Sequence, residues 1–196
     1  MSGIGRDGAV SRRDFFTRGL SRAIGRAATV LGEEIAPARY VRPPGALPEA
    51  AFVAACTRCG ACADACPPRV IRMESQGAGL AVGTPTLDLA TGACLMCPDM
   101  PCATACPTSA LAVPDDGWAQ VRLADLLLDT ARCLPHRDVA CGICALACPV
   151  GEGALATDDR GRPVVGAACT GCGQCLSACV TTPTSLAARP PQPRYA

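Results

Sequence analysis

The sequence predicts an α+β fold in which small hairpins and short helices repeat around groups of cysteines, with much irregular structure. Three observations support this prediction. The 196-residue chain has 16 cysteines, and they fall into four groups of four with none left over. Aromatic residues make up only 3% of the chain, too few for an ordinary hydrophobic core of this size. Short apolar stretches and turn signals flank each cysteine group, as expected for small hairpins.

The four cysteine groups have closely related spacings. The first follows C-x2-C-x2-C-x3-C-P, the run of bacterial ferredoxins, and the fourth differs only in having Val180 in place of the proline. The second and third each lengthen one internal spacing, to four and to seven residues. The groups span residues 56–66, 94–106, 133–148 and 169–179, and their members are Cys56, Cys59, Cys62, Cys66, Cys94, Cys97, Cys102, Cys106, Cys133, Cys141, Cys144, Cys148, Cys169, Cys172, Cys175 and Cys179.

This spacing suits a cubane [4Fe–4S] cluster. Three cysteines two residues apart can wrap one cluster in a tight loop, and the fourth then points away toward a second cluster. The motifs should therefore work in pairs, which predicts tandem ferredoxin-like modules over residues 43–188. All sixteen cysteines are the predicted iron ligands, and the predicted cofactors are four [4Fe–4S] clusters. We expect the clusters to replace the missing apolar core, so that folding depends on metal.

Two other uses of cysteine compete with this interpretation. Zinc sites commonly combine two C-x2-C pairs that are well separated in sequence, whereas each motif here holds all four cysteines within a short run. A disulfide scaffold also uses an even number of cysteines, particularly in exported proteins. The C-x2-C-x2-C run places neighbouring cysteines too close for a network of long-loop disulfides. The sequence therefore favours iron–sulfur clusters over both alternatives.

The segments after the motifs also repeat. A turn of small residues and then an apolar pair follows each motif, and the pairs are Val70-Ile71, Ala110-Leu111, Ala154-Leu155 and Ser185-Leu186. We expect small hairpins there, a helical turn at each fourth cysteine, and tight turns at 115–117 and 158–161. Residues 123–128 are compatible with a strand or a helix, because so short a run shows no clear period.

Taken in order, these motifs resemble the NapG/MauM ferredoxin-type proteins, which are electron carriers associated with periplasmic nitrate reductase and methylamine-utilisation systems. The resemblance covers roughly residues 40 to 188. The stretches that carry it are Arg42-Pro43-Pro44-Gly45-Ala46, Gly83-Thr84-Pro85, CLMCPDMPCATACPTSAL at the second motif and CTGCGQCLSACV at the fourth.

The resemblance implies an electron carrier that has no catalytic residues of its own. It would relay electrons from a membrane-bound quinol-oxidising iron–sulfur protein to a periplasmic reductase or cytochrome. It also implies that the first motif pairs with the fourth and the second with the third. Two other functions remain open: a non-redox assembly or maturation factor that uses the clusters as structural pins, and an electron-transfer subunit of a larger oxidoreductase complex.

Residues 1–42 differ in composition from the rest of the chain, with eight arginines against four acidic residues. The pair Arg12-Arg13 resembles a twin-arginine export motif, and Ala36-Pro37-Ala38 fits an A-x-A cleavage site. The apolar run between them is interrupted by Arg18, Arg22 and Arg26, which would lie opposite an apolar stripe on a helix. We expect a periplasmic protein exported by this route, with a retained amphipathic helix on a cytoplasmic membrane surface as the alternative.

Composition also excludes several classes of protein. A net charge of +1 argues against a nucleic-acid binder. The longest uncharged run, 163–188, holds four cysteines with glycine and proline breaks, so it does not predict a transmembrane span. One histidine and no lysine leave few groups for acid–base catalysis.

Individual residues and the carboxyl end give further expectations. We expect His136 in a surface loop and Trp118 packed between repeats. Arg58 and Arg69, near the first motif, should either raise a cluster's potential or remain solvated. Residues 189–196 should form an extended, mobile, proline-rich tail.

Overall fold

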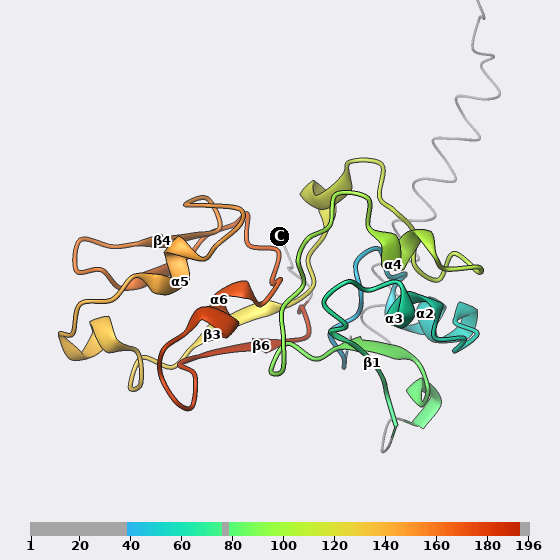
Figure 1. Ribbon diagram of the computed structural model, residues 1–196, viewed down its shortest axis with the longest axis horizontal. Helices are drawn as coiled ribbons and strands as arrows, with labels where there is room; N and C mark the ends of the chain where they lie inside the picture. The colour runs from blue at the N-terminus through green and yellow to red at the C-terminus, as the bar shows by residue number, and fades with distance from the viewer. Residues whose placement is uncertain (1–38, 76–78, 193–196) are drawn as a thin grey trace, which may run out of the picture.

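The computed structural model describes residues 39–75 and 79–192, which form two lobes lying side by side (Figure 1). The predicted export motif, the alternative amphipathic helix and the A-x-A site all lie outside the described residues, as do residues 193–196. Within these ranges no helix has the length and apolar character needed to cross a membrane. Each lobe holds two successive cysteine motifs.

Each motif carries one short helix, and that helix contains the third cysteine of the motif. The four helices are α3 (Ala61–Asp64), α4 (Pro101–Thr104), α5 (Ile143–Leu146) and α6 (Gln174–Ala178). The predicted helical turn at each fourth cysteine is therefore placed slightly too late. The fourth cysteine follows the helix, and Cys179 itself is already extended with φ −63° and ψ 127°.

An extended segment follows each helix, and it starts at the second residue of the predicted apolar pair. Both members of every pair are buried, with exposed fractions of 5% or less. Their burial against the cysteines explains why so few aromatic residues suffice, because the core cluster itself includes the thiol groups. The extended segments are β1 (Ile71–Met73), an isolated bridge at Leu111, β4 (Leu155–Thr157) and β6 (Leu186–Arg189).

One antiparallel hairpin follows the first motif of each lobe, as predicted. The hairpins predicted after the second and fourth motifs do not form among the described residues, because the extended segments there pair with the start of their own lobe instead. In the first lobe β1 pairs with β2 (Pro85–Leu87), and the 3-10 helix η1 (Gly79–Ala81) lies between them. In the second lobe β4 pairs with β5 (Pro163–Val165) around the predicted turn at 158–161. The Asp158 side chain stabilises that turn by accepting hydrogen bonds from the backbone N–H groups of Arg160 and Arg162.

The chain ends of each lobe also meet. Ala46 forms a single antiparallel bridge with Leu111 in the first lobe. In the second lobe β3 (Asp125–Leu128) pairs along four residues with β6, so the ambiguous run at 123–128 contains a strand. The 3-10 helix η2 (Gly117–Gln120) lies in the connection between the lobes, and η3 (Leu134–Arg137) fills the long spacing of the third motif.

Two predicted domain boundaries shift in the structure. Arg42, placed in the N-terminal segment, is 7% exposed, and its guanidinium lies 4.7 Å from the ring centroid of Phe52. Phe52 is fully buried and belongs to α2 (Glu49–Ala55), a helix without a counterpart among the described residues of the second lobe. Arg189, placed in the mobile tail, pairs with Asp125 at the end of β6. Both lobes therefore extend beyond the predicted limits of 43 and 188.

Candidate iron–sulfur centres

The sixteen cysteines converge on four cavities, and each cavity is lined by four of them. Three come from one motif, and the other is the last cysteine of the neighbouring motif. We number each quartet after the motif that supplies three of its members. The first quartet is Cys56, Cys59, Cys62 and Cys106. The second is Cys94, Cys97, Cys102 and Cys66. The third is Cys133, Cys141, Cys144 and Cys179. The fourth is Cys169, Cys172, Cys175 and Cys148.

The short helices produce this exchange of cysteines. Cys62 lies within α3 and lines the first cavity, whereas Cys66 follows the helix and lines the second. Cys102 lies within α4 and lines the second cavity, whereas Cys106 follows that helix and lines the first. A single helical turn therefore separates the cysteines that serve the two cavities of one lobe, which is the predicted crossing of the fourth cysteine.

The predicted pairing of motifs is wrong. The first motif exchanges its last cysteine with the second, and the third exchanges with the fourth. The physical reason is helix packing, because α3 packs against α4 and α5 packs against α6. Each pair of helices packs beside the hairpin of its own lobe, so a crossing from the first motif to the fourth would have to leave one lobe for the other.

The donor set of each cavity fits a [4Fe–4S] cluster. Four thiols surround a hollow of about 310 to 380 Å³, a volume that includes its open mouth. None of the sixteen cysteines forms a disulfide. Across the described ranges, no group of three or more His, Cys, Asp or Glu side chains is arranged to hold a single metal ion. Each quartet supplies the four thiolates that a cubane cluster requires.

Burial makes these thiols poor acids in the absence of iron. Burial raises the pKa of Cys62 and Cys94 to about 11 and that of Cys102 and Cys175 to about 12, and repulsion from neighbouring thiolates adds to the effect. The thiols of one quartet therefore cannot all ionise near neutral pH without a compensating positive charge. Bound iron would supply that charge, so its binding would release protons from these thiols and stabilise the fold.

Two cysteines depart from this trend. Hydrogen bonds from the backbone N–H of Leu111 and from Thr108 outweigh burial and lower the pKa of Cys106, and Cys179 shows the larger effect. Burial also acts to raise the pKa of Cys179, but hydrogen bonds from the hydroxyls of Ser185, Thr181 and Thr184 outweigh it and lower the pKa to about 6. The sequence analysis did not identify these hydroxyls. The signal that could have found them is Ser185 itself, a polar residue in a buried pair position that is apolar in the other three repeats.

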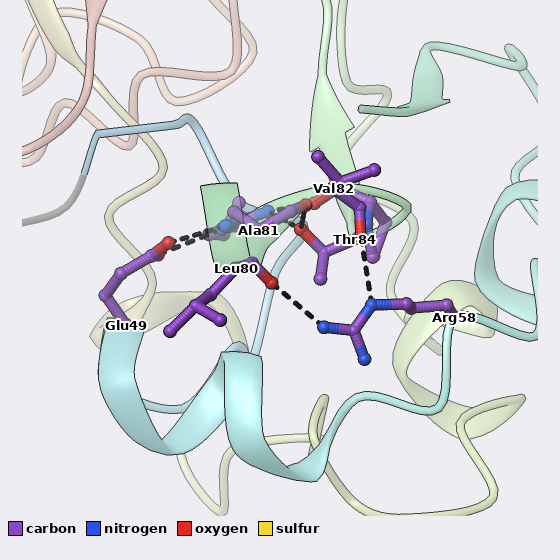
Figure 2. A network of polar contacts seen from close by, with 8 residues as sticks. Glu49, Arg58, Leu80, Ala81, Val82 and Thr84 are labelled. Carbon is purple, nitrogen blue, oxygen red and sulfur yellow. Dashed lines mark hydrogen bonds and ion pairs between the residues drawn. The ribbon is translucent and has the colours of Figure 1, made fainter. Parts of the chain in front are cut away.

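Arg58 stabilises the loop of the first quartet. It lies between Cys56 and Cys59 in the left-handed conformation, with φ 60°. Its guanidinium donates to the carbonyl oxygens of Leu80 and Val82, both at 2.9 Å, so it ties the cysteine loop to η1 (Figure 2). Arg58 is exposed and therefore in contact with solvent, as one of the two expectations held, but its hydrogen bonds also give it a positioning role.

The same segment is anchored at its other end by Arg42. The Arg42 guanidinium donates to the Thr84 hydroxyl and the Pro85 carbonyl at 2.8 Å each, and it forms an ion pair with Glu49. The Thr84 hydroxyl in turn donates to the Ala81 carbonyl, as Figure 2 shows. This network connects α2, η1 and β2 around the first quartet, and the sequence analysis missed it because its members are far apart in sequence.

The other single residues lie as follows. The Trp118 indole N–H donates to the Cys97 carbonyl at 2.9 Å, and Trp118 lines the second cavity from η2 in the inter-lobe connection. This confirms the prediction that it packs between repeats. His136 is half-buried in η3 and does not line the third cavity. Arg69 is exposed, also with a left-handed backbone at φ 50°.

The two lobes contact each other through cysteine loops. The backbone N–H of Cys94 donates to the carbonyl of Cys172 at 2.8 Å, and the Gln174 side chain donates to the Cys94 carbonyl at 3.2 Å. Gly173 favours this close approach, because a Cβ there would lie 3.0 Å from Leu89 Cδ2 of the first lobe, and its φ of +83° favours glycine. The second and fourth quartets are thus neighbours across the lobe interface.

Comparison with known proteins agrees with this geometry. Residues 55–110 and 125–180 each match a 4Fe-4S dicluster domain, so each matched region coincides with one lobe and one pair of motifs. A methylamine utilization ferredoxin-type protein MauM from Methylorubrum extorquens is 39% identical, with 87% of this chain and 84% of the relative covered. The chain belongs to the MauM and NapG family of ferredoxin-type proteins.

Further relatives support this membership. MauM of Paracoccus denitrificans is 38% identical over 87% of this chain and 84% of its own. The ferredoxin-type protein NapG of Escherichia coli is 35% identical over 84% of this chain and 80% of its own. No solved structure matches the chain significantly. As a member of this family, the protein is a ferredoxin-type iron–sulfur electron carrier with four [4Fe–4S] clusters in two dicluster domains.

Proposed function

We propose that each of the four cysteine quartets ligates one [4Fe–4S] cluster, so that all sixteen cysteines are iron ligands. A [4Fe–4S] cluster stores and releases one electron at a time. The protein residues hold the sites, exclude water from them and keep them adjacent. The buried thiols, the exchange of cysteines between motifs and the absence of disulfides among them support this assignment.

We further propose that the sites form one linear relay in the order first, second, fourth, third. The observation that carries this order is the hydrogen bond between the Cys94 N–H and the Cys172 carbonyl, which joins the second and fourth quartets directly. Within each lobe the exchanged cysteines keep the two sites adjacent. The ends of the relay are then the first quartet, where Cys59 is exposed, and the third quartet, on the far side of the second lobe from this contact.

The ends would meet two different partners. We propose that one end receives electrons from a membrane-bound quinol-oxidising iron–sulfur protein and the other delivers them to a periplasmic reductase or cytochrome. The family membership and the Arg12-Arg13 pair support this direction and location. One relative is named for methylamine utilization, and another is named only as the ferredoxin-type protein NapG. These names do not specify the substrate of this chain's own partner.

The relay order can be tested by magnetic coupling between reduced clusters. Cys97→Ala should remove the cluster of the second quartet and so simplify the electron paramagnetic resonance signals of the first and fourth quartets, leaving that of the third unchanged. The matched variant Cys141→Ala should remove the cluster of the third quartet and, of the three remaining signals, alter only that of the fourth. An unchanged fourth-quartet signal in Cys97→Ala would contradict the proposed contact between the lobes.

The location can be tested separately. Arg12→Lys combined with Arg13→Lys should leave the protein in the cytoplasm with about sixteen iron atoms, because twin-arginine transport requires that pair and acts on folded cargo. Unaltered protein should be found in the periplasm. Membrane-bound full-length protein on the cytoplasmic face, insensitive to the double change, would instead support a cytoplasmic donor.

A further inference from the structure

The last cysteine of the fourth motif has unusual contacts at its sulfur. Cys179 Sγ lies 3.3 Å from the Thr181 hydroxyl oxygen and 3.3 Å from the Ser185 hydroxyl oxygen. An iron-bound thiolate carries no hydrogen, so both hydroxyls must donate to it. The Ser185 N–H donates to the Thr181 oxygen at 2.8 Å, which leaves the Thr181 hydroxyl hydrogen free for the sulfur. The two hydroxyls are therefore oriented as donors.

The other exchanged cysteines have weaker contacts or none. The sulfur of Cys106 accepts from the Leu111 N–H at 3.5 Å and lies 3.7 Å from the Thr108 hydroxyl. No hydrogen bond reaches the sulfur of Cys66 or Cys148 from the residues that the structure describes. The residue two positions after the exchanged cysteine is Pro68, Thr108, Val150 and Thr181 in chain order, so only Cys106 and Cys179 have a hydroxyl there.

Ser185 distinguishes the fourth motif further. It occupies the first position of the buried pair and is only 4% exposed. The same position holds Val70, Ala110 and Ala154 in the other repeats, so packing there does not require a hydroxyl. A buried hydroxyl needs a hydrogen-bond partner, and the Cys179 sulfur is the partner of Ser185.

Hydrogen bonds to ligand sulfur favour the reduced form of a cluster, because they stabilise the negative charge that reduction adds. In the second lobe this effect acts on one site only, since Cys179 lines the third cavity and Cys148 the fourth. We propose that Thr181 and Ser185 raise the reduction potential at the third quartet above that at the fourth, so that an electron in the second lobe rests at the outer end of the relay. This inference rests on the proposed function, which makes the third quartet a ligand set and an end of the relay.

The decisive variant is Ser185→Ala, measured by spectroscopically monitored redox titration of the intact chain. Alanine already occupies the equivalent place at Ala110 and Ala154, so the fold should tolerate it. One of the four midpoint potentials should fall, corresponding to about a tenfold change in the reduction equilibrium, or about 59 mV for a one-electron couple. Ser177→Ala, which removes an exposed serine from α6, is the matched control and should shift none.

Two further variants assign the shift. The signal that moves in Ser185→Ala should be the one that is lost in Cys141→Ala. Ala154→Ser introduces the missing hydroxyl after Cys148 and should raise a different midpoint potential, that of the fourth quartet. Retention of all four signals in Cys141→Ala would overturn the ligand assignment of the proposed function. Loss of one signal there, with the same signal unmoved in Ser185→Ala, would overturn this inference alone.

Discussion

The two lobes hold the same arrangement of cysteines and stabilise it in different ways. The first lobe closes its chain ends with one bridge, and it depends on a buried arginine that contacts α2, β2 and two aromatic rings. The second lobe has no equivalent of α2 among its described residues, and it closes with the four-residue pairing of β3 and β6. The comparison teaches that the cysteine quartets define the repeat, whereas the surrounding scaffold can be built from a polar network or from strand pairing.

The largest effect should come from removing iron, which tests whether either scaffold is sufficient alone. We expect chelation under oxidising conditions to unfold both lobes, because two-stranded sheets are marginal without a core and the thiol quartets form much of this one. Far-ultraviolet circular dichroism and hydrogen exchange would report the loss. Exchange protection that persists in β3 and β6 would show that strand pairing holds the second lobe without metal.

A single exchanged cysteine should have a smaller effect, confined to one lobe. Cys66→Ser should disturb the cluster of the second quartet and leave Cys56, Cys59 and Cys62 unaffected, because Cys66 lines only the second cavity. Iron content should fall from about sixteen to about twelve atoms if the site is lost. The matched change in the second lobe is Cys148→Ser, which should disturb the fourth quartet. Loss of the fourth-quartet cluster with the second-quartet cluster retained in Cys66→Ser would restore the rejected pairing.

The buried arginine tests the polar network of the first lobe. Arg42→Met should destabilise that lobe by about 3 kcal/mol, because it leaves the Glu49 carboxylate, 12% exposed, without its partner. Hydrogen exchange in β2 should accelerate while β4 and β5 stay protected. The control is Arg189→Met in the second lobe, which removes a half-exposed partner of Asp125. Asp125 keeps its ion pair with Arg122, so this change should cost less than about 1 kcal/mol. Equal effects of the two changes would remove the contrast between the lobes.

The smallest effect concerns the exposed arginine of the first cysteine loop. Arg58→Gln should cost about 1 kcal/mol, because hydrogen bonds at an exposed site compete with water. Hydrogen exchange should accelerate locally in residues 79–84. Arg72→Gln, on the exposed face of β1, supplies a control of equal charge change. A global loss of protection in the first lobe would mean that Arg58 does more than position η1.

The sequence predicted the features that depend on nearby residues. The cysteine spacings predicted four sites, the apolar pairs predicted the buried start of each extended segment, and Asp158 marked the hairpin turn. Each of these follows from local geometry within a few residues. The helical turn was predicted at the fourth cysteine of each motif, but it contains the third. The spacing C-x3-C indicates a change of chain direction and does not determine which of the two cysteines lies inside the helix.

The features that the sequence did not predict depend on contacts between distant segments. The pairing of motifs is decided by which helices pack together, and α3 and α4 carry no signal of that choice. Arg42 was grouped with the arginine-rich amino terminus, since burial against Phe52 and Glu49 cannot be read from composition. The hydroxyls at Cys179 were missed because serine and threonine are ordinary turn residues, and only the structure directs them to a sulfur atom.

The exchange of Cys66 and Cys106 between neighbouring motifs has a consequence for biosynthesis. When synthesis of the chain has reached β1, three of the four cysteines of the first site have been made. The fourth, Cys106, follows more than thirty residues later. The first site therefore remains open throughout that interval, and both sites of the lobe become complete only when α4 folds against α3. The second lobe repeats this delay with Cys179. A complete set of four thiols is thus available at every site of a lobe only after the second motif of that lobe has been synthesised.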